Sequence, residues 1–191
     1  MTALPLVLAS QSPRRRALLE GLGLAFTVSP AHIDETPRAG ETPDELVTRL
    51  CQAKALAVSE QYSDSLIIAA DTTVALEDTF LEKPRDQAEK RTFIEMLSGK
   101  SHTVFTGHAV VWQGQLEQRT IATSVHFRDL SAREIDWYVA TEEGLDKAGG
   151  YAIQGYGAAL ISEIHGCYFN VVGMSLAAVL DMCQQLGVPL V

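Results

Sequence analysis

Three groups of side chains in this sequence have the types and spacing that suit chemistry. The first is segment 9–16, in which serines precede three consecutive arginines. The second is the glycine-rich segment 146–155, which contains a single uncharged amide side chain, Gln154. The third is a set of carboxylates and lysines spread along the first half of the chain: Glu35, Lys54, Asp71 and Lys83.

Segment 9–16 is predicted to join a strand to a helix. The apolar run 4–8 that precedes it predicts a buried strand. Ser12 is a favourable N-cap residue, and Pro13 suits the first position of a helix. A helix N-terminus carries free backbone N–H groups and a partial positive charge, so this turn suits a bound anion.

Three arginines at the start of the predicted helix strengthen that interpretation. Arginines in a first turn oppose the helix dipole by roughly some tenths of a kcal/mol each, where Asp or Glu is more usual. They therefore require an anion, which either the protein or a ligand can provide. Arg14 and Arg15 offer guanidinium forks that match phosphate oxygens, and Ser10 adds a hydroxyl. We interpret the segment as a phosphate site and favour a ligand phosphate.

Composition limits the classes of protein to which this chain can belong. Its 191 residues suit one domain, or one domain with two lobes. A hydrophobic content of 47% and a charged content of 20% are typical of globular proteins. The net charge of −9 argues against a general nucleic-acid binder, because such proteins present a basic face to phosphate backbones. Any phosphate site must therefore be local.

Cysteine use and the absence of long apolar runs predict a cytoplasmic protein. The three cysteines, Cys51, Cys167 and Cys183, are widely spaced and odd in number. Neither a disulfide framework nor a structural zinc site is predicted. The N-terminal apolar run precedes the arginines, which is the reverse of a signal peptide, and no apolar run reaches the length of a membrane span.

Alternating strand and helix patterns predict a mixed α/β fold around a long central sheet. Capping boxes at Thr42–Glu45 and at Ser131–Glu134, and Asp86 before Glu89, mark helix starts. The expected helices cover 13–22, 43–61, 87–97, 132–140 and 175–186. The expected strands cover 4–8, 25–29, 66–70, 102–112, 116–127 and 158–164, with a small hairpin of 73–77 and 80–83 and a Gln113–Gly114 turn between the two long strands.

Asp71 directly follows the apolar run 66–70, which is predicted to end there. In open α/β sheets, ligands collect at the carboxyl ends of the strands. A carboxylate at that place can bind a metal or serve as a base. The alternative is that Asp71 is only a turn residue.

Lys54 falls inside an apolar stripe of the predicted helix 43–61. A lysine on that face must extend to solvent, pair with a carboxylate or meet an anion. Lys83 precedes Pro84, so its backbone is expected to be extended, and alone it indicates no function. The stripe consists of Leu46, Val47, Leu50, Ala53, Ala57 and Val58.

Glu35 and Gln154 both lie in segments predicted to be irregular. Glu35 is in the long loop 30–41, where an acid is usually solvated but where catalytic residues also occur. Gln154 is flanked by glycines that let a backbone approach a ligand, and its amide suits the edge of a nucleobase. A tight turn with an exposed glutamine is the alternative. From the residues alone, we expect a small acidic enzyme with a phosphate pocket and carboxylates for a divalent metal.

The motifs, taken in order, resemble those of the Maf family over nearly the whole chain. Maf proteins are nucleoside triphosphate pyrophosphatases. The resemblance implies a single Maf-like domain over 1–191, with an elongated two-lobed mixed-sheet α/β fold similar to that of inosine triphosphatase and an active-site cleft between the lobes. The matching motifs are ASQSPRR at 9–15, Lys54, ADT at 70–72, EKP at 82–84, HTVFTG at 102–107, DKAGGYAIQG at 146–155 and YFNVVG at 168–173.

Segment 146–155 with Gln154 resembles the branch of the family that hydrolyses dTTP and UTP. The sister branch, which acts on 7-methyl-GTP, has a different sequence there. In the dTTP/UTP branch, the positions that match Arg14, Thr72 and Gln154 are associated with substrate choice. Ala152 stands where glycine is more usual. The implied reaction converts a nucleoside triphosphate and water into the monophosphate and pyrophosphate, with modified pyrimidine nucleotides as further house-cleaning substrates.

The resemblance also implies roles for individual residues. Glu35 and Asp71 would hold a divalent cation (Mg²⁺, Mn²⁺ or Co²⁺), and Asp71 would accept the proton of the attacking water. The phosphates would be bound by Ser10, Arg14, Arg15, Lys54 and Lys83.

The expected partner is the nucleotide itself, with no nucleic-acid polymer and no membrane, and a homodimer is expected from the family. Two alternatives remain: a 7-methyl-GTP pyrophosphatase, and a nucleotide-binding regulator of septation.

Overall fold

The structure is a computed structural model, which describes residues 4–77 and 79–191. The predicted mixed α/β fold is confirmed. The helices are α1 (Pro13–Gly21), α2 (Pro43–Ser59), α3 (Gln87–Leu97), α4 (Ala132–Val139), α5 (Tyr168–Val172) and α6 (Leu176–Gln185), with 3₁₀ turns η1 (Ala148–Gly150) and η2 (Gly155–Leu160). The strands are β1 (Leu6–Leu8), β2 (Thr27–Val28), β3 (Leu66–Leu76), β4 (Thr79–Leu81), β5 (Ser101–Trp112), β6 (Gln115–Phe127) and β7 (Ile161–His165).

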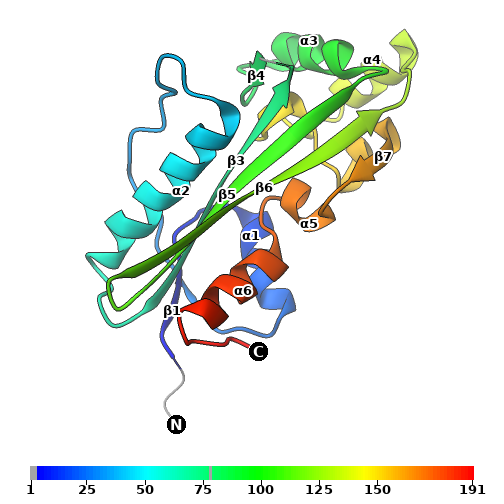
Figure 1. The fold of residues 1–191 in the computed structure, drawn as a ribbon. Helices are drawn as coiled ribbons and strands as arrows, with labels where there is room; N and C mark the ends of the chain where they lie inside the picture. The colour runs from blue at the N-terminus through cyan, green and yellow to red at the C-terminus, as the bar shows by residue number, and fades with distance from the viewer. Residues whose placement is uncertain (1–3, 78) are drawn as a thin grey trace. The chain divides into compact units, whose positions relative to one another are not determined.

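The strands form one seven-stranded mixed sheet (Figure 1). Its order is β2-β1-β3-β5-β6-β7, and β4 pairs with the end of β3. β1 runs parallel to β2 and to β3, whereas β4 is antiparallel to β3 and β7 is antiparallel to β6. None of the helices in the described part of the chain has the length and apolar character needed to cross a membrane.

The chain divides into two compact units. The first contains the residues up to Asp71 together with Thr106–Ile121 and Gly173–Val191, and the second contains Thr72–Phe105 and Ala122–Val172. The division therefore passes through β3, β5 and β6. Because each unit is assembled from distant stretches of sequence, no simple linker could have revealed it. The expectation of a single domain over 1–191 stays a prediction.

In the first unit, β3 is covered by helices on both faces, which explains its unbroken apolar sequence. Leu66 and Ile68 belong to a core cluster with Leu19 of α1 and with residues of α6. Ile67 and Ala69 belong to a separate cluster with residues of α2. Successive side chains of a strand point to opposite faces, so the position of Asp71 two residues after Ala69 directs its side chain toward α2.

Gly107 on β5 allows α2 to lie close to the sheet. A Cβ atom at this position would be 2.3 Å from the carbonyl oxygen of Val47 and 3.0 Å from Sγ of Cys51. Any side chain here would push α2 away from β5. The glycine therefore helps to fix the distance of α2, and of the residues it carries, from the sheet.

The second unit has its own core, built on β4, α3, α4, the second halves of β3 and β6 and the first half of β5. At its centre, the rings of His102, Phe127 and Tyr151 make mutual edge-to-face contacts with centroids 4.9–5.2 Å apart. His102 Nε2 lies 2.7 Å from the Tyr151 hydroxyl. Burial lowers the pKa of His102 to about 4, so the ring is neutral at physiological pH.

The predicted helix starts are confirmed, because local capping interactions determine them. Ser12 accepts from the N–H of Arg15, Asp86 accepts from Glu89, and Ser131 accepts from Glu134. Several boundaries differ from expectation by one or two residues, the short helix α5 was not expected, and two strand boundaries differ by three residues or more. β3 continues for six residues beyond Ala70, and the final strand begins at Ile161 because residues 155–160 form η2.

Candidate active site in the first unit

Asp71 lies inside a strand, which corrects the prediction that the strand ends before it. β1 pairs with β3 only as far as Leu8 opposite Ile68, whereas β3 itself continues to Leu76. Antiparallel pairing of Val74 with Leu81 of β4 extends β3 beyond its polar residues. Asp71 therefore lies just past the end of its parallel neighbour, where the backbone is held in strand geometry rather than in a turn.

Lys54 is buried on the sheet-facing side of α2 and pairs with two carboxylates. Its Nζ lies 2.5 Å from Asp71 Oδ1 and 2.8 Å from Glu35 Oε1. The side chains of Lys54 and Asp71 are 11% and 13% exposed, whereas that of Glu35 is 52% exposed. Of the outcomes left open for a lysine in an apolar stripe, pairing with carboxylates is the one observed. Two acids 36 residues apart in sequence thus meet at one ammonium group.

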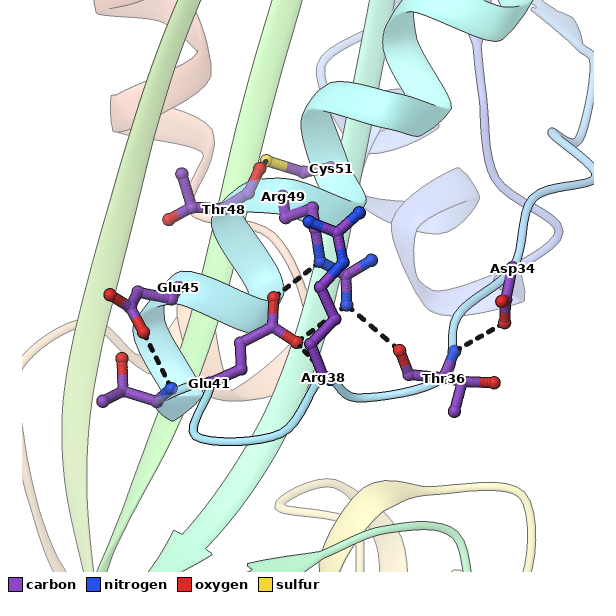
Figure 2. Close-up of polar contacts among 9 residues, drawn as sticks. Asp34, Thr36, Arg38, Glu41, Glu45, Thr48, Arg49 and Cys51 are labelled. Carbon is purple, nitrogen blue, oxygen red and sulfur yellow. Dashed lines mark hydrogen bonds and ion pairs between the residues drawn. The ribbon is translucent and has the colours of Figure 1, made fainter.

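The loop that carries Glu35 is fastened to α2 by Arg49, as Figure 2 shows. Arg49 Nε and Nη2 contact the two carboxylate oxygens of Glu41 at 2.6 and 2.8 Å. Arg49 Nη2 also donates to the carbonyl of Thr36, the residue after Glu35, at 3.2 Å. The fork-to-fork hydrogen bonds lower the pKa of Glu41 to about 2, so this anchor is charged at any physiological pH.

Hydrogen bonds between residues close together in sequence stiffen the same loop. The Thr36 N–H donates to Asp34 Oδ1 at 2.9 Å, and the Arg38 N–H donates to Glu41 Oε2 at 2.9 Å (Figure 2). These turns and the Arg49 anchor bracket Glu35 on both sides. Sequence reasoning did not identify Arg49 or Glu41, because nothing in their spacing distinguishes them from an ordinary surface pair.

The turn between β1 and α1 has the predicted form, with Ser12 as N-cap and Pro13 at the first helical position. Ser10 Oγ accepts hydrogen bonds from the Ser12 N–H at 3.2 Å and from Arg15 Nη1 at 3.1 Å. A hydroxyl oxygen has two lone pairs, and both are used here, so the Ser10 proton is available to donate to an acceptor. This is the polarity that an anion site requires.

The consecutive arginines have different environments. Arg15 is buried and donates through Nε to the Gly173 carbonyl at 2.8 Å. Burial lowers its pKa from the usual value, although the guanidinium remains protonated, and the Asp71 carboxylate opposes that shift. Arg16 is exposed and pairs with Glu20 at 2.7 Å, so the protein supplies its anion. Arg14 is half-buried.

The first unit thus contains one group of residues that suits an anion and a second group that consists of carboxylates. Ser10 and Arg15 are hydrogen-bonded to each other, and Glu35 and Asp71 are brought together by Lys54. Two carboxylates that converge on a cation are a donor set that suits Mg²⁺, which commonly takes one or two protein carboxylates and completes its shell with phosphates and water. In residues 4–77 and 79–191, no cluster of three or more His, Cys, Asp or Glu side chains has metal-site geometry.

Burial keeps Cys51 and Cys183 out of this chemistry. All three cysteines are free thiols, as the sequence predicts. Cys51 lies on α2 in the same core cluster as Ile67 and Ala69, and its burial raises its pKa to about 12. Burial likewise raises the pKa of Cys183 to about 11. Neither thiol supplies a thiolate at neutral pH.

The remaining predicted site residues belong to the second unit. Thr72 follows Asp71 on β3 and is half-buried, whereas Lys83 and Gln154 are exposed. Lys83 follows β4, and Gln154 directly precedes η2. The Gly149 N–H donates to the Glu82 carbonyl at 3.2 Å, so the segment of Lys83 and the start of segment 146–155 are hydrogen-bonded within this unit.

Comparison with known proteins agrees with these motifs. Residues 5–186 match the family model described as Maf-like protein. A protein from Myxococcus xanthus named dTTP/UTP pyrophosphatase is 46% identical over 97% of this chain and 94% of its own length. A protein of the same name from Syntrophus aciditrophicus is 44% identical over 95% and 90%, and one from Anaeromyxobacter dehalogenans is 47% identical over 97% and 95%.

Among solved structures, a HAM1 protein from Coxiella burnetii matches 65% of this chain and 73% of its own, with a TM-score of 0.45 and 18% identity. That likeness is too distant to bear on the function. The family match and the curated relatives, by contrast, extend over nearly the entire sequence. This chain belongs to the Maf-like protein family.

Proposed function

We propose that this protein is a nucleoside triphosphate pyrophosphatase that hydrolyses dTTP and UTP to the monophosphate and pyrophosphate. The observation that carries the proposal is the meeting of Lys54 with Asp71 and Glu35 in the first unit. The names of the relatives supply the substrate class: proteins 44–47% identical over most of the chain are called dTTP/UTP pyrophosphatases.

In the proposed reaction, Asp71 accepts a proton from a water molecule as the oxygen of that water bonds to the α-phosphorus. The bond from the α-phosphorus to the oxygen bridging the α- and β-phosphates breaks, and that oxygen leaves with pyrophosphate. Lys54 holds the Asp71 carboxylate through Oδ1, and strand geometry fixes the backbone of Asp71. Such positioning reduces the motion that a general base must undergo before it acts.

Glu35 and Asp71 are the residues that would hold a divalent cation, with Mg²⁺, Mn²⁺ and Co²⁺ as candidates. When bound, the cation would neutralise phosphate charge and polarise the phosphorus. The Arg49 anchor keeps Glu35 in its loop position, whereas Asp71 is fixed by its strand.

Ser10, Arg14, Arg15, Lys54 and Lys83 are proposed to bind the phosphates and to stabilise the leaving pyrophosphate. The Ser10 hydroxyl suits this role because its oxygen already accepts two hydrogen bonds, which leaves its proton to be donated to a phosphate oxygen. Arg15 has a further role within the protein, since its Nε is bonded to the Gly173 carbonyl. Its contribution to phosphate binding is then exerted through Ser10 as well as through its charge.

Gln154 is proposed to recognise the O4/N3 edge of uracil or thymine, an acceptor and donor pair that an amide can match. Arg14 and Thr72 are proposed to contribute to substrate choice. We further propose that the enzyme works in the cytoplasm, forms a homodimer and binds neither nucleic-acid polymers nor membranes. Modified pyrimidine nucleotides would then be further substrates.

The test is pyrophosphate release from dTTP, UTP, CTP, GTP, ATP and 7-methyl-GTP with each of the three candidate cations. Turnover concentrated on dTTP and UTP supports the proposal. Turnover concentrated on 7-methyl-GTP would keep the catalytic residues and overturn the assignment of the base pocket. Nucleotide binding with no turnover on any of them would favour a regulator of septation.

A further inference from the structure

We propose that Glu143 is a specificity-positioning residue, which holds the segment around Gln154 in the conformation that presents this amide to the base. The inference rests on the proposed function, because it concerns how the pyrimidine is selected. All of the contacts that carry it lie within the second unit.

The Glu143 carboxylate binds backbone N–H groups directly after Gln154. Oε1 accepts from the Gly157 N–H at 2.7 Å, and Oε2 accepts from the Tyr156 N–H at 3.1 Å. These N–H groups belong to the second and third residues of η2, for which Gln154 is the N-cap residue without a side-chain cap. Glu143, from a turn eleven residues earlier, therefore does what a capping side chain normally does, and leaves the Gln154 amide exposed.

Tyr138 extends this support to the residues before Gln154. Its hydroxyl donates to Glu143 Oε1 at 3.2 Å and accepts from the Ala152 N–H at 3.3 Å. The Tyr138 ring is fully buried in the core of the second unit. The same hydroxyl and carboxylate thus hold the backbone two residues before and two and three residues after Gln154, which fixes the direction in which the amide leaves the chain.

Gly155 shows how closely Glu143 lies against this backbone. A Cβ atom at position 155 would be 2.2 Å from Glu143 Oε2. The φ angle of Gly155 is +72°, which L-residues rarely adopt. The glycine in the Ile153-Gln154-Gly155 sequence is required both by the turn and by the carboxylate beside it.

A buried lysine holds the end of the helix that carries Tyr138. Lys90 on α3 is fully buried, and its Nζ donates to the carbonyl of Tyr138 at 2.9 Å and to that of Val139 at 3.3 Å. These carbonyls are at the C-terminal end of α4, where a cation is favourable. Lys90 therefore fixes the end of the helix from which Tyr138 reaches Glu143.

The test compares Glu143→Ala, Glu143→Gln and Tyr138→Phe with the control Glu142→Gln, an exposed neighbour that undergoes the same change of charge. Two quantities are measured on the full-length enzyme: kcat/KM for UTP, and the inhibition constant of inorganic tripolyphosphate, which has no base. Because the N–H groups of Tyr156 and Gly157 lose the acceptor that holds them in place, we expect Glu143→Ala to lower kcat/KM for UTP by about tenfold, chiefly through KM.

The inhibition constant for tripolyphosphate is expected to stay within about twofold, because the phosphate site is not changed. Glu143→Gln retains one acceptor oxygen and should show a smaller loss, and Glu142→Gln should show none. A merely structural role would weaken UTP and tripolyphosphate together, and that result would overturn the inference. If Glu143→Ala does not fold, the same comparison is made with Glu143→Gln and Tyr138→Phe.

Gln154→Ala separates this inference from the proposed function. A UTP-selective loss in both Gln154→Ala and Glu143→Ala supports both ideas. A loss in Gln154→Ala alone would overturn the role of Glu143 and leave base recognition by Gln154 intact. A loss in Glu143→Ala alone would overturn recognition by the amide, and with it the role of Glu143 in presenting that amide to the base. No selective loss in either variant would overturn both.

Discussion

Lys54 on α2 and Asp71 on β3 form an ion pair of 2.5 Å in which both side chains are almost fully buried. The pair arises because the α2 face that carries Lys54 packs on the β3 face that carries Ile67, Ala69 and then Asp71. Burying two charges is costly unless each is well partnered. A protein that retains such a pair beside a third charged residue, Glu35, is better explained by function than by stability.

Replacement of Asp71 by asparagine keeps the shape of the side chain and removes the proton acceptor. We expect Asp71→Asn to fold and to bind UTP, and to lose turnover by about 10²- to 10⁴-fold, the range typical of a general base. Binding is measured by calorimetry and turnover by pyrophosphate release. Asp64→Asn, at an exposed position, is the matched control. Near wild-type turnover in Asp71→Asn would remove Asp71 from the mechanism.

Loss of Lys54 should affect binding as well as turnover, unlike loss of Asp71. Lys54→Met keeps the apolar stem of the side chain and removes the ammonium. We expect kcat/KM for UTP to fall by about 10²-fold or more, because both the phosphate contact and the placement of Asp71 are lost. Lys100→Met, at an exposed position, should be unaffected. An unchanged kcat/KM in Lys54→Met would contradict a role at the phosphates.

The Arg49 anchor predicts how the loop of Glu35 responds to mutation. Arg49→Ala removes the contacts to Glu41 and to the Thr36 carbonyl, so the loop should open more often. We expect faster cleavage by trypsin after Arg38 and a higher Mg²⁺ concentration for half-maximal activity. Arg85→Ala breaks an exposed ion pair with Glu89 and serves as the control. Equal cleavage rates in the two variants would show that Arg49 does not hold the loop.

Two buried histidines predict the pH dependence of stability. His108 donates from Nδ1 to the Arg119 carbonyl at 3.1 Å, and its Nε2 accepts from the Ser175 N–H at 2.8 Å; this tautomer is assigned from the partners. Burial lowers the pKa of both His108 and His102 to about 4. Protonation of His108 would also replace the Nε2 acceptor by a second donor.

The direction in which stability changes with pH follows from the lowered pKa values of the two histidines. Between about pH 4 and pH 6.5 the unfolded chain binds more protons than the native one, so stability rises with pH across that window and is lost as pH falls through it. The loss is at most roughly 3 kcal/mol for each histidine. Urea unfolding at pH 4.5 and pH 7 should show a smaller difference in His108→Gln than in the wild type. His165→Gln, at an exposed site, should leave the difference unchanged.

Much of the fold is predictable from local chemistry. Helices begin where Ser12, Asp86 and Ser131 cap them, and a Gln113–Gly114 turn with both φ angles positive joins β5 to β6. The length of β3 was not predictable, because its polar residues after Ala70 continue the strand through pairing with neighbouring strands, which the local sequence does not show. The short helix α5 and the turn η2 likewise depend on tertiary contacts.

The candidate site, like the fold, is predictable from the sequence only in part. Periodicity shows that Lys54 must face the core, but only the fold shows that Asp71 and Glu35 meet it there. Arg49 and Glu143 have no distinguishing pattern in the sequence, because each acts by binding backbone groups of a segment distant from it. Residues that carry the chemistry are therefore easier to predict from sequence than residues that position them.

The most direct measurement is hydrolysis of UTP in water labelled with ¹⁸O, followed by mass spectrometry of the two products. If Asp71 directs water to the α-phosphorus, the label appears in UMP, and pyrophosphate remains unlabelled. Label in pyrophosphate would place the attack at the β-phosphorus, and formation of UDP and inorganic phosphate would show a different bond cleaved. Either result would contradict the proposed reaction.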